Sequence, residues 1–257
     1  MVSTWPGPLG TLMLPNATGG ANWQGGAFDP ETKMFYIFTN TQPTPLGLVK
    51  PDPTKSDFDW VQGTARNPDA PVPSATPAPA AAAGGRGATL SDAGSPIPAP
   101  AGGGRGGGGG GEGGGNLTVQ GLPLIKPPYG RITALDMNKG TLAWQIAHGE
   151  TPDNVKNNPA LKGVTIPKTG RQGRIGVLVT KTLVIAGEGG FFTTPNRLRG
   201  AMLRAYDKAT GNELGAVYMP APQTGSPMTY FYNGKQYIVV AVSGASYSAE
   251  LLAFKLP

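Results

Sequence analysis

Hydrophobic positions in this chain fall in short runs with few helical periods, and glycine, proline or asparagine bounds most of them. Short runs between turn residues are typical of β-strands. One helix candidate covers residues 153–161, and because Pro159 interrupts it we expect a turn of helix at most. The pattern therefore predicts an all-β fold. The expected strands are residues 24–28, 34–39, 131–137, 141–146, 175–180, 182–187, 201–206, 212–219, 228–232, 236–242 and 251–255.

One hairpin pattern occurs twice. Residues 132–144 and 203–215 each run from an apolar strand into an aspartate, Asp136 or Asp207, and a glycine follows four positions later. Aspartate suits the entry of a turn, and glycine suits a position with positive φ. Trp144 ends the first copy, whereas Gly215 takes that place in the second. Grouped in fours, the expected strands therefore form repeated antiparallel sheets.

Residues 63–115 differ in composition from the rest of the chain. Proline and alanine dominate residues 67–83, and residues 102–115 are glycine apart from Arg105 and Glu112. Such a segment buries too little apolar surface to offset the entropy of ordering it. We therefore expect a disordered insertion. Its isolated arginines lack the aromatic residues that a nucleic-acid platform uses.

Composition and charge exclude several classes of function. The 257 residues contain no cysteine and one histidine, which excludes disulfides, thiolate metal sites and multi-histidine sites. The formal net charge of +6 is spread along the chain, so we expect no nucleic-acid partner. Residues 1–15 do not form a signal-peptide pattern, and no apolar run reaches the roughly 18 residues of a transmembrane helix.

The glycine-rich motif of residues 19–30, GGANWQGGAFDP, precedes a strand-like run. Glycines allow close approach of the backbone to a ligand, and here they surround an amide and an indole. This motif resembles the start of a late blade in the dehydrogenases that depend on pyrroloquinoline quinone (PQQ). The repeated hairpin resembles the tryptophan-docking motif of the same family. Residues 125–130 and 234–244 are most similar to its membrane-type glucose or aldose dehydrogenase branch.

The resemblance implies an incomplete β-propeller. The strands account for about three blades, the last with three strands, whereas a closed propeller typically has four to eight blades and the family has eight. We expect residues 1–62 to begin the propeller and to carry the cofactor-floor motif, and residues 116–257 to form C-terminal blades. The chain then resembles the C-terminal portion of a longer polypeptide, and we expect exposed blades to need the missing N-terminal ones as partners.

The family places the asparagine of this motif against the quinone, so the resemblance makes Asn22 the first candidate for cofactor contact. A turn asparagine that binds only local backbone is the alternative. Trp23 is a second candidate, although we expect it to pack within the blade. Arg174 precedes an inner strand and could face the carboxylates of PQQ, or it could be a surface arginine. We expect His148 to lie in a solvated peripheral loop without a catalytic role.

The resemblance implies a periplasmic quinoprotein that oxidises a sugar or an alcohol by hydride transfer to PQQ and passes electrons to a quinone or cytochrome. In the family, the calcium ligands and the catalytic aspartate lie N-terminal to the glycine-rich motif. We therefore assign no catalytic or metal-binding residue to this chain, and expect little activity from it alone. A noncatalytic β-propeller scaffold or binding module is the alternative.

Overall fold

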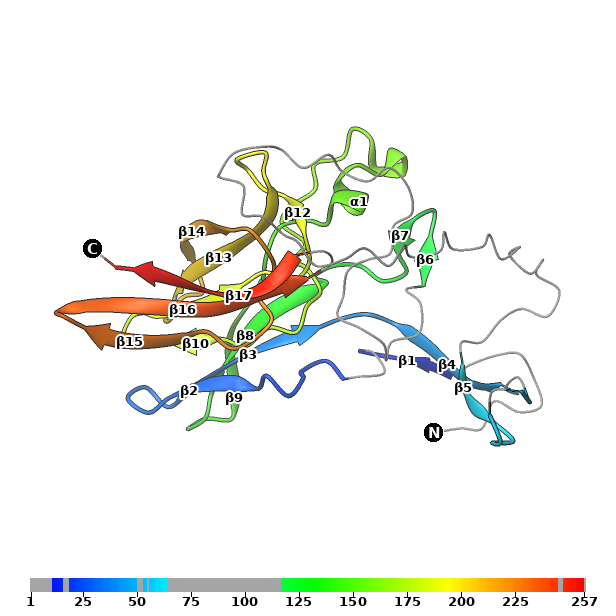
Figure 1. The fold of residues 1–257 in the computed structure, drawn as a ribbon, viewed down its shortest axis with the longest axis horizontal. Helices are drawn as coiled ribbons and strands as arrows, with labels where there is room; N and C mark the ends of the chain where they lie inside the picture. Colours follow the sequence, from blue (N-terminus) through cyan, green and yellow to red (C-terminus); the bar gives the residue numbers. More distant parts are fainter. Residues whose placement is uncertain are drawn as a thin grey trace, which may run out of the picture.

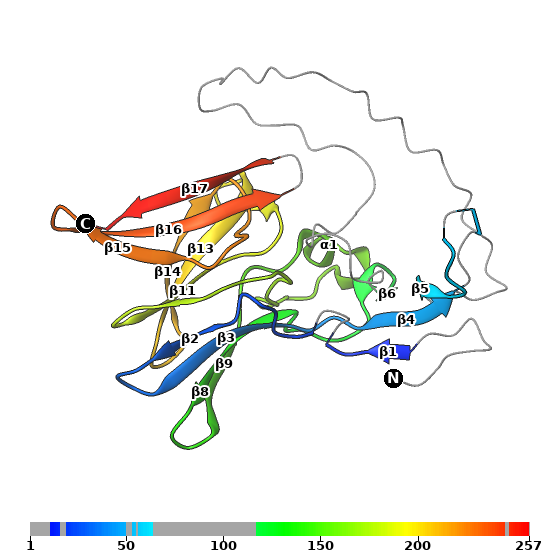
Figure 2. The same cartoon turned by 60° about the horizontal axis from the view of Figure 1, so that its bottom comes forward.

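The computed structural model describes residues 11–15, 19–49, 53–54, 56–63, 117–244 and 247–256. Strands among these residues form five sheets, and three of the sheets pack face to face as successive blades (Figures 1 and 2). Residues 64–116, which make up nearly all of the predicted insertion, lie outside the described residues. Disorder in the insertion therefore stays a prediction.

The first blade has four antiparallel strands in the order β2-β3-β8-β9. Strands β3 and β8 are far apart in the sequence but pair along their whole length, from Met34 opposite Asp136 to Asn40 opposite Gly130. The blade therefore splits around the insertion, as the sequence predicted. The strands are β2 (Gly26–Asp29), β3 (Met34–Asn40), β8 (Gly130–Asp136) and β9 (Thr141–Ala147).

The second blade also has four antiparallel strands that pair in the order in which they occur in the chain, β10-β11-β13-β14. Strand β11 is buried on both faces because blades lie on either side of it, and this explains its uninterrupted apolar sequence. A short strand, β12 (Phe192–Thr193), pairs with the beginning of β13. The main strands are β10 (Leu178–Val179), β11 (Leu183–Gly187), β13 (Arg199–Asp207) and β14 (Glu213–Met219).

The third blade has three strands in the order β15-β16-β17, which confirms the count made from the sequence. Among the described residues no further strand pairs with β17, so this strand forms the edge of the sheet. The strands are β15 (Met228–Tyr232), β16 (Lys235–Gly244) and β17 (Tyr247–Lys255).

The remaining elements lie beside the blades (Figure 2). Sequence reasoning did not predict the small sheets, because their strands are very short or contain proline. It did predict the single turn of helix, which is confirmed as α1 (Asp153–Lys156) followed by a 3₁₀ turn (Pro159–Leu161). The small sheets contain β1 (Thr11–Met13), β4 (Thr44–Val49) and β5 (Val61–Gly63), and β6 (Thr118–Val119) with β7 (Leu122–Pro123).

The core lies between the blades. Alternate side chains of β11 point in opposite directions, so that Val184 packs toward the first blade and Ile185 toward the third. The first interface buries large residues of β3 and β9, among them Tyr36 and Trp144, and the second buries the inward face of β16. Each blade is therefore stabilised mainly by its neighbour.

Trp144 docks on the hairpin of the next blade. Its indole Nε1 donates to the carbonyl of Lys208 over 3.1 Å, and a Cβ on Gly211 would lie 2.9 Å from the indole ring. Gly211 also has a φ of +76°, so both the close indole ring and the backbone conformation favour glycine there. Asp207 accepts hydrogen bonds from the backbone of the same turn. These contacts confirm the turn chemistry, while Gly215 has open space where Trp144 has a partner.

Candidate functional site

The first strands of the three blades begin close together. The Ser226 hydroxyl, just before β15, donates to the carbonyl of Gln24, just before β2, over 3.4 Å. A Cβ on Gly176, just before β10, would overlap the same hydroxyl. Strands β2, β10 and β15 are therefore the inner strands, and the loops that precede them meet at the inner edge of the blades.

The glycine-rich motif forms a tight turn that leads directly into β2. The Gly25 N–H donates to the carbonyl of Asn22 over 2.9 Å, and the φ of Gly25 is +65°. A Cβ on Gly26 would lie 2.5 Å from the carbonyl oxygen of Tyr36, so glycine allows β2 to approach β3 there. The path of this loop therefore depends on glycine at both positions.

Asn22 is half-buried in this turn, and only the oxygen of its side-chain amide makes a hydrogen bond with the described residues. The amide oxygen accepts a hydrogen bond from the Trp23 N–H over 2.7 Å. This is the local backbone contact expected of a turn asparagine. The amide nitrogen makes no hydrogen bond within the described part of the chain. It can therefore donate a hydrogen bond to an oxygen atom of a ligand.

The prediction that Trp23 packs within the blade is wrong. Its side chain is 86% exposed, in contrast to Trp144 at 8%. Packing fails because Trp23 lies in the turn before β2 and not on a strand face that meets another blade. The exposed indole is free to contact a ligand, so Trp23 stays a prediction as a cofactor residue.

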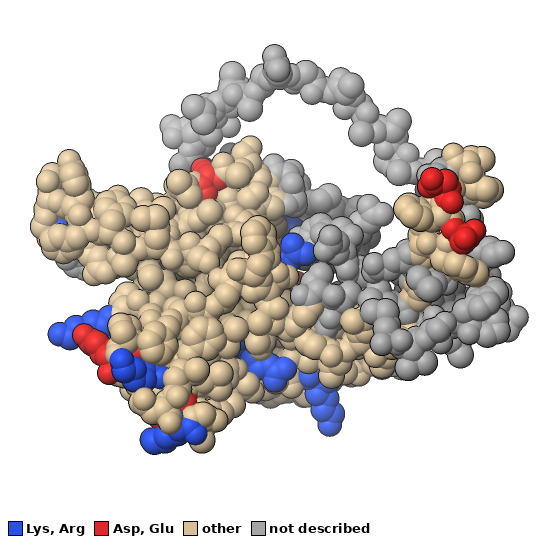
Figure 3. All heavy atoms as spheres, turned by 90° about the horizontal axis from the view of Figure 1, so that it is seen from below, with Lys and Arg blue, Asp and Glu red and all other residues tan. Residues whose placement is uncertain are grey.

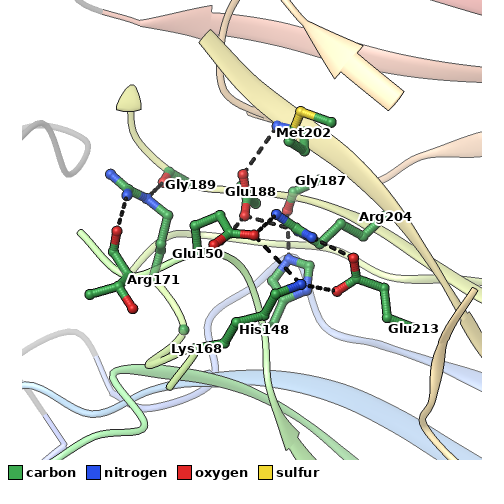
Figure 4. A network of polar contacts seen from close by, with 12 residues as sticks. His148, Glu150, Lys168, Arg171, Gly187, Glu188, Gly189, Met202, Arg204 and Glu213 are labelled. Carbon is green, nitrogen blue, oxygen red and sulfur yellow. Dashed lines mark hydrogen bonds and ion pairs between the residues drawn. The ribbon is translucent and has the colours of Figure 1, made fainter. Parts of the chain in front are cut away.

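The segment 169–176 places its two arginines differently. Arg174, the candidate from the sequence, is half-buried and forms no ion pair with the described residues. Arg171, which sequence reasoning did not single out, is buried and donates to the carbonyl of Gly189 (Figure 4). It also donates to the carbonyls of Thr151 and Phe191. Its guanidinium carbon lies 4.7 Å from the centre of the Phe192 ring. Arg171 therefore holds loops together, while Arg174 keeps its charge available.

His148 is not solvated, contrary to the sequence prediction. The ring is 1% exposed, with Nε2 2.9 Å from the Gly187 carbonyl oxygen and Nδ1 2.8 Å from the Tyr206 hydroxyl (Figure 4). A carbonyl can only accept, so Nε2 carries the proton and Nδ1 accepts from Tyr206. The second blade covers the end of β9, and the sequence around His148 carries no signal of that cover.

Beside His148 lies an ion network with a buried centre, Arg204 and Glu188, which joins the first two blades (Figure 4). The Arg204 guanidinium donates to Glu188 over 3.0 Å, to Glu213 over 2.6 Å and to Glu150 over 2.8 Å. Glu188 is fully buried and also accepts from the backbone of Glu150 and Met202. Burial alone lowers the pKa of Arg204, but the surrounding carboxylates outweigh it and raise that pKa. Arg204 therefore stays charged.

Burial lowers the pKa of His148 to about 4, from an ordinary value of 6.5. The unfolded chain binds a proton at His148 more tightly than the folded chain does. Above pH 6.5 this histidine therefore costs the fold nothing, and as the pH drops from 6.5 to 4 its protonation lowers the free energy of unfolding by about 3 kcal/mol. NMR can follow this group alone, because it is the one histidine of the chain. We expect a titration near pH 4, and a midpoint near 6.5 would contradict the buried neutral ring.

Asn40, at the end of β3, connects the loop that carries Asn22 to the segment that carries Arg174. Its backbone N–H donates to Gly20 in the glycine-rich motif over 2.8 Å, and its side chain binds both backbone groups of Gly173. Sequence reasoning did not identify this residue. A polar amide that closes an apolar strand is the signal that could have drawn attention to it.

Metal, membrane and charge features add little to this site. Within the described ranges, no three His, Cys, Asp or Glu side chains are grouped to hold a metal ion, and no helix has the length and apolar character to span a membrane. On the face drawn in Figure 3, basic side chains lie apart or next to acidic ones. The lack of a nucleic-acid partner stays a prediction.

Comparison with known families decides the identity of the fold. The model of the β-propeller domain of PQQ-dependent glucose, ethanol and alcohol dehydrogenases matches residues 2–104 and 110–238. The chain belongs to this family. The all-β sheets are therefore blades of a PQQ-dehydrogenase propeller, and within the described residues they do not close into a ring.

Relatives in this quinoprotein family carry several substrate names. The quinate/shikimate dehydrogenase (quinone) of Acinetobacter baylyi is 29% identical over 96% of this chain and 26% of its own length. The quinoprotein glucose dehydrogenase of Escherichia coli is 30% identical over 53% of this chain and 17% of its own length. The solved quinohemoprotein alcohol dehydrogenase of Comamonas testosteroni aligns with 91% of this chain and 24% of its own, at 20% identity and a TM-score of 0.46. This chain thus spans about a quarter or less of these proteins.

Proposed function

We propose that this chain supplies one side of the PQQ site in a quinoprotein dehydrogenase that oxidises a sugar or an alcohol. The main support for this proposal is the arrangement of Asn22 in the loop before β2. There Asn22 is fixed on its oxygen side by the Trp23 N–H, and its amide nitrogen has no partner among the described residues. Membership in the PQQ-dehydrogenase family gives this donor a suitable ligand.

The residues present fit an anionic, flat cofactor with quinone oxygens. Asn22 offers an N–H donor, Trp23 an exposed ring, and Arg174 a cation with no ion pair in the described part of the chain. An arginine matches a carboxylate well, and an aromatic face suits a planar ring. Glycines at positions 25 and 26 keep side chains out of the turn that carries Asn22 and Trp23.

The chemistry that PQQ supplies when bound is the acceptance of a hydride from the alcohol carbon of the substrate. In this proposal Asn22 donates to a quinone oxygen, Arg174 binds a carboxylate and Trp23 covers the ring. The calcium ligands and the general base come from segments beyond the part that this chain shares with its relatives. The proposal also places the protein in the periplasm, within the glucose or aldose dehydrogenase branch, with a quinone or a cytochrome as electron acceptor. We expect the chain alone to show little activity.

Replacing Asn22 with Ala tests the cofactor contact. We expect PQQ affinity to fall roughly ten- to hundredfold, which corresponds to about 1–3 kcal/mol for one hydrogen bond in a desolvated site. The fold is expected to survive because Asn22 precedes β2 and packs in no core. PQQ titration in calcium of the complete polypeptide that carries this chain, with and without the substitution, measures the difference.

Asn212→Ala is the matched control, since this asparagine lies exposed in a hairpin turn of the second blade. It should bind PQQ like the parent. Equal affinity of the parent and the Asn22→Ala variant would remove Asn22 from the site. A parent that binds no PQQ would favour the noncatalytic scaffold.

A further inference from the structure

The side chain of Asn40 bridges from the first blade to the second. Its Nδ2 donates to the Gly173 carbonyl over 2.7 Å, and its Oδ1 accepts from the Gly173 N–H over 2.9 Å. A primary amide carries its donor nitrogen and its acceptor oxygen side by side on separate atoms, so it can satisfy both backbone groups of one residue. Such a pair of bonds fixes the position of Gly173 and also the direction of its backbone.

The two ends of this bridge lie next to the candidate cofactor residues. Gly173 immediately precedes Arg174, and Gly20, which binds the backbone N–H of Asn40, lies two residues before Asn22. Asn40 therefore connects the loop that carries Asn22 to the segment that carries Arg174. The two candidates come from different blades, and their separation depends on how those blades meet.

Close backbone packing leaves this segment little freedom. A Cβ on Gly173 would lie 2.8 Å from the Cα of Gly189, in the loop that follows β11. Arg171, two residues earlier, donates to the carbonyls of Gly189 and Phe191 in that loop. The segment is thus held by the second blade on one side and by Asn40 on the other.

We propose that Asn40 is a positioning residue for the cofactor: its amide holds Gly173 so that Arg174 faces the ligand that Asn22 contacts. This inference rests on the proposed function. It concerns the side chain of Asn40 alone, because the bond to Gly20 comes from the backbone and survives substitution.

A double-mutant cycle with Arg174 tests the inference in the complete polypeptide that carries this chain. PQQ affinity is measured by titration for the parent, Asn40→Ala, Arg174→Ala and the double variant. We expect each single substitution to weaken binding about tenfold. In the Arg174→Ala background, Asn40→Ala should then lower PQQ affinity by less than about threefold, because Asn40 acts through Arg174.

A thermal melt of each protein without PQQ separates positioning from folding. A purely structural role would lower the melting temperature and leave PQQ affinity unchanged, which would overturn the inference. Asn40→Asp keeps the shape and the acceptor toward the Gly173 N–H, so it replaces Asn40→Ala if that variant does not fold. Asn138→Ala, in the exposed hairpin at the other end of β8, is the control and should match the parent.

The outcomes distinguish the two proposals. If the parent binds PQQ but Asn40→Ala binds it equally well, the positioning role is wrong and the proposed function stands. The positioning role is also wrong if Asn40→Ala lowers PQQ affinity by the same factor with and without Arg174. If the parent itself does not bind PQQ, the proposed function fails, and this inference fails with it.

Discussion

Arg204→Met should lower the free energy of unfolding by about 3–5 kcal/mol, because it leaves the buried carboxylate of Glu188 without its cation. Glu188 is fully buried, and the Arg204 side chain is 3% exposed. Lys168 also contacts Glu213 and Glu150, but it is half-exposed and does not reach Glu188 in the network. Urea denaturation followed by circular dichroism measures the loss.

Arg199→Met is the matched control on the same strand. Arg199 is exposed and lies over the Phe191 ring, with its guanidinium carbon 5.2 Å from the centroid. A contact of this kind is worth about 0.5–1 kcal/mol. Equal losses in the two variants would show that the network does not stabilise the blade interface.

Trp144→Ala should cost about 3–5 kcal/mol of unfolding free energy, since it removes a large buried side chain and leaves a cavity between two blades. It also removes the hydrogen bond to the Lys208 carbonyl and the packing against Tyr36, whose ring centre lies 5.7 Å away. Denaturation under the same conditions measures the effect.

Trp23→Ala is the control for the loss of an indole. Because Trp23 is 86% exposed, this substitution should change the free energy of unfolding by no more than about 0.5 kcal/mol. A large loss in Trp23→Ala, or a small one in Trp144→Ala, would contradict the assignment of docking to Trp144.

Local features of the fold could be predicted from the sequence because they depend on neighbouring residues. The strands and the aspartate–glycine turns follow from side chains a few positions apart, as Asp207 and Gly211 illustrate. The blade count followed from the order of the strands. The strands β1, β4 and β5 were missed, since β1 and β5 have only three residues each and β4 contains a proline.

Features that depend on contact between blades could not be predicted in this way. His148 follows an outer strand, and its burial arises from Gly187 and Tyr206, far along the chain. Asn40 and Gly173 are 133 positions apart. The sequence indicated Arg174, just before an inner strand, but it could not tell that the nearby Arg171 turns inward to bind carbonyls while Arg174 does not.

A crystal structure of the complete polypeptide bound to PQQ would show whether this chain contacts the cofactor, because it locates PQQ relative to the loop before β2. We expect the Asn22 amide nitrogen to lie about 3 Å from a PQQ oxygen, at hydrogen-bond distance. PQQ bound away from residues 19–23, or an Asn22 side chain turned from it, would contradict the claim.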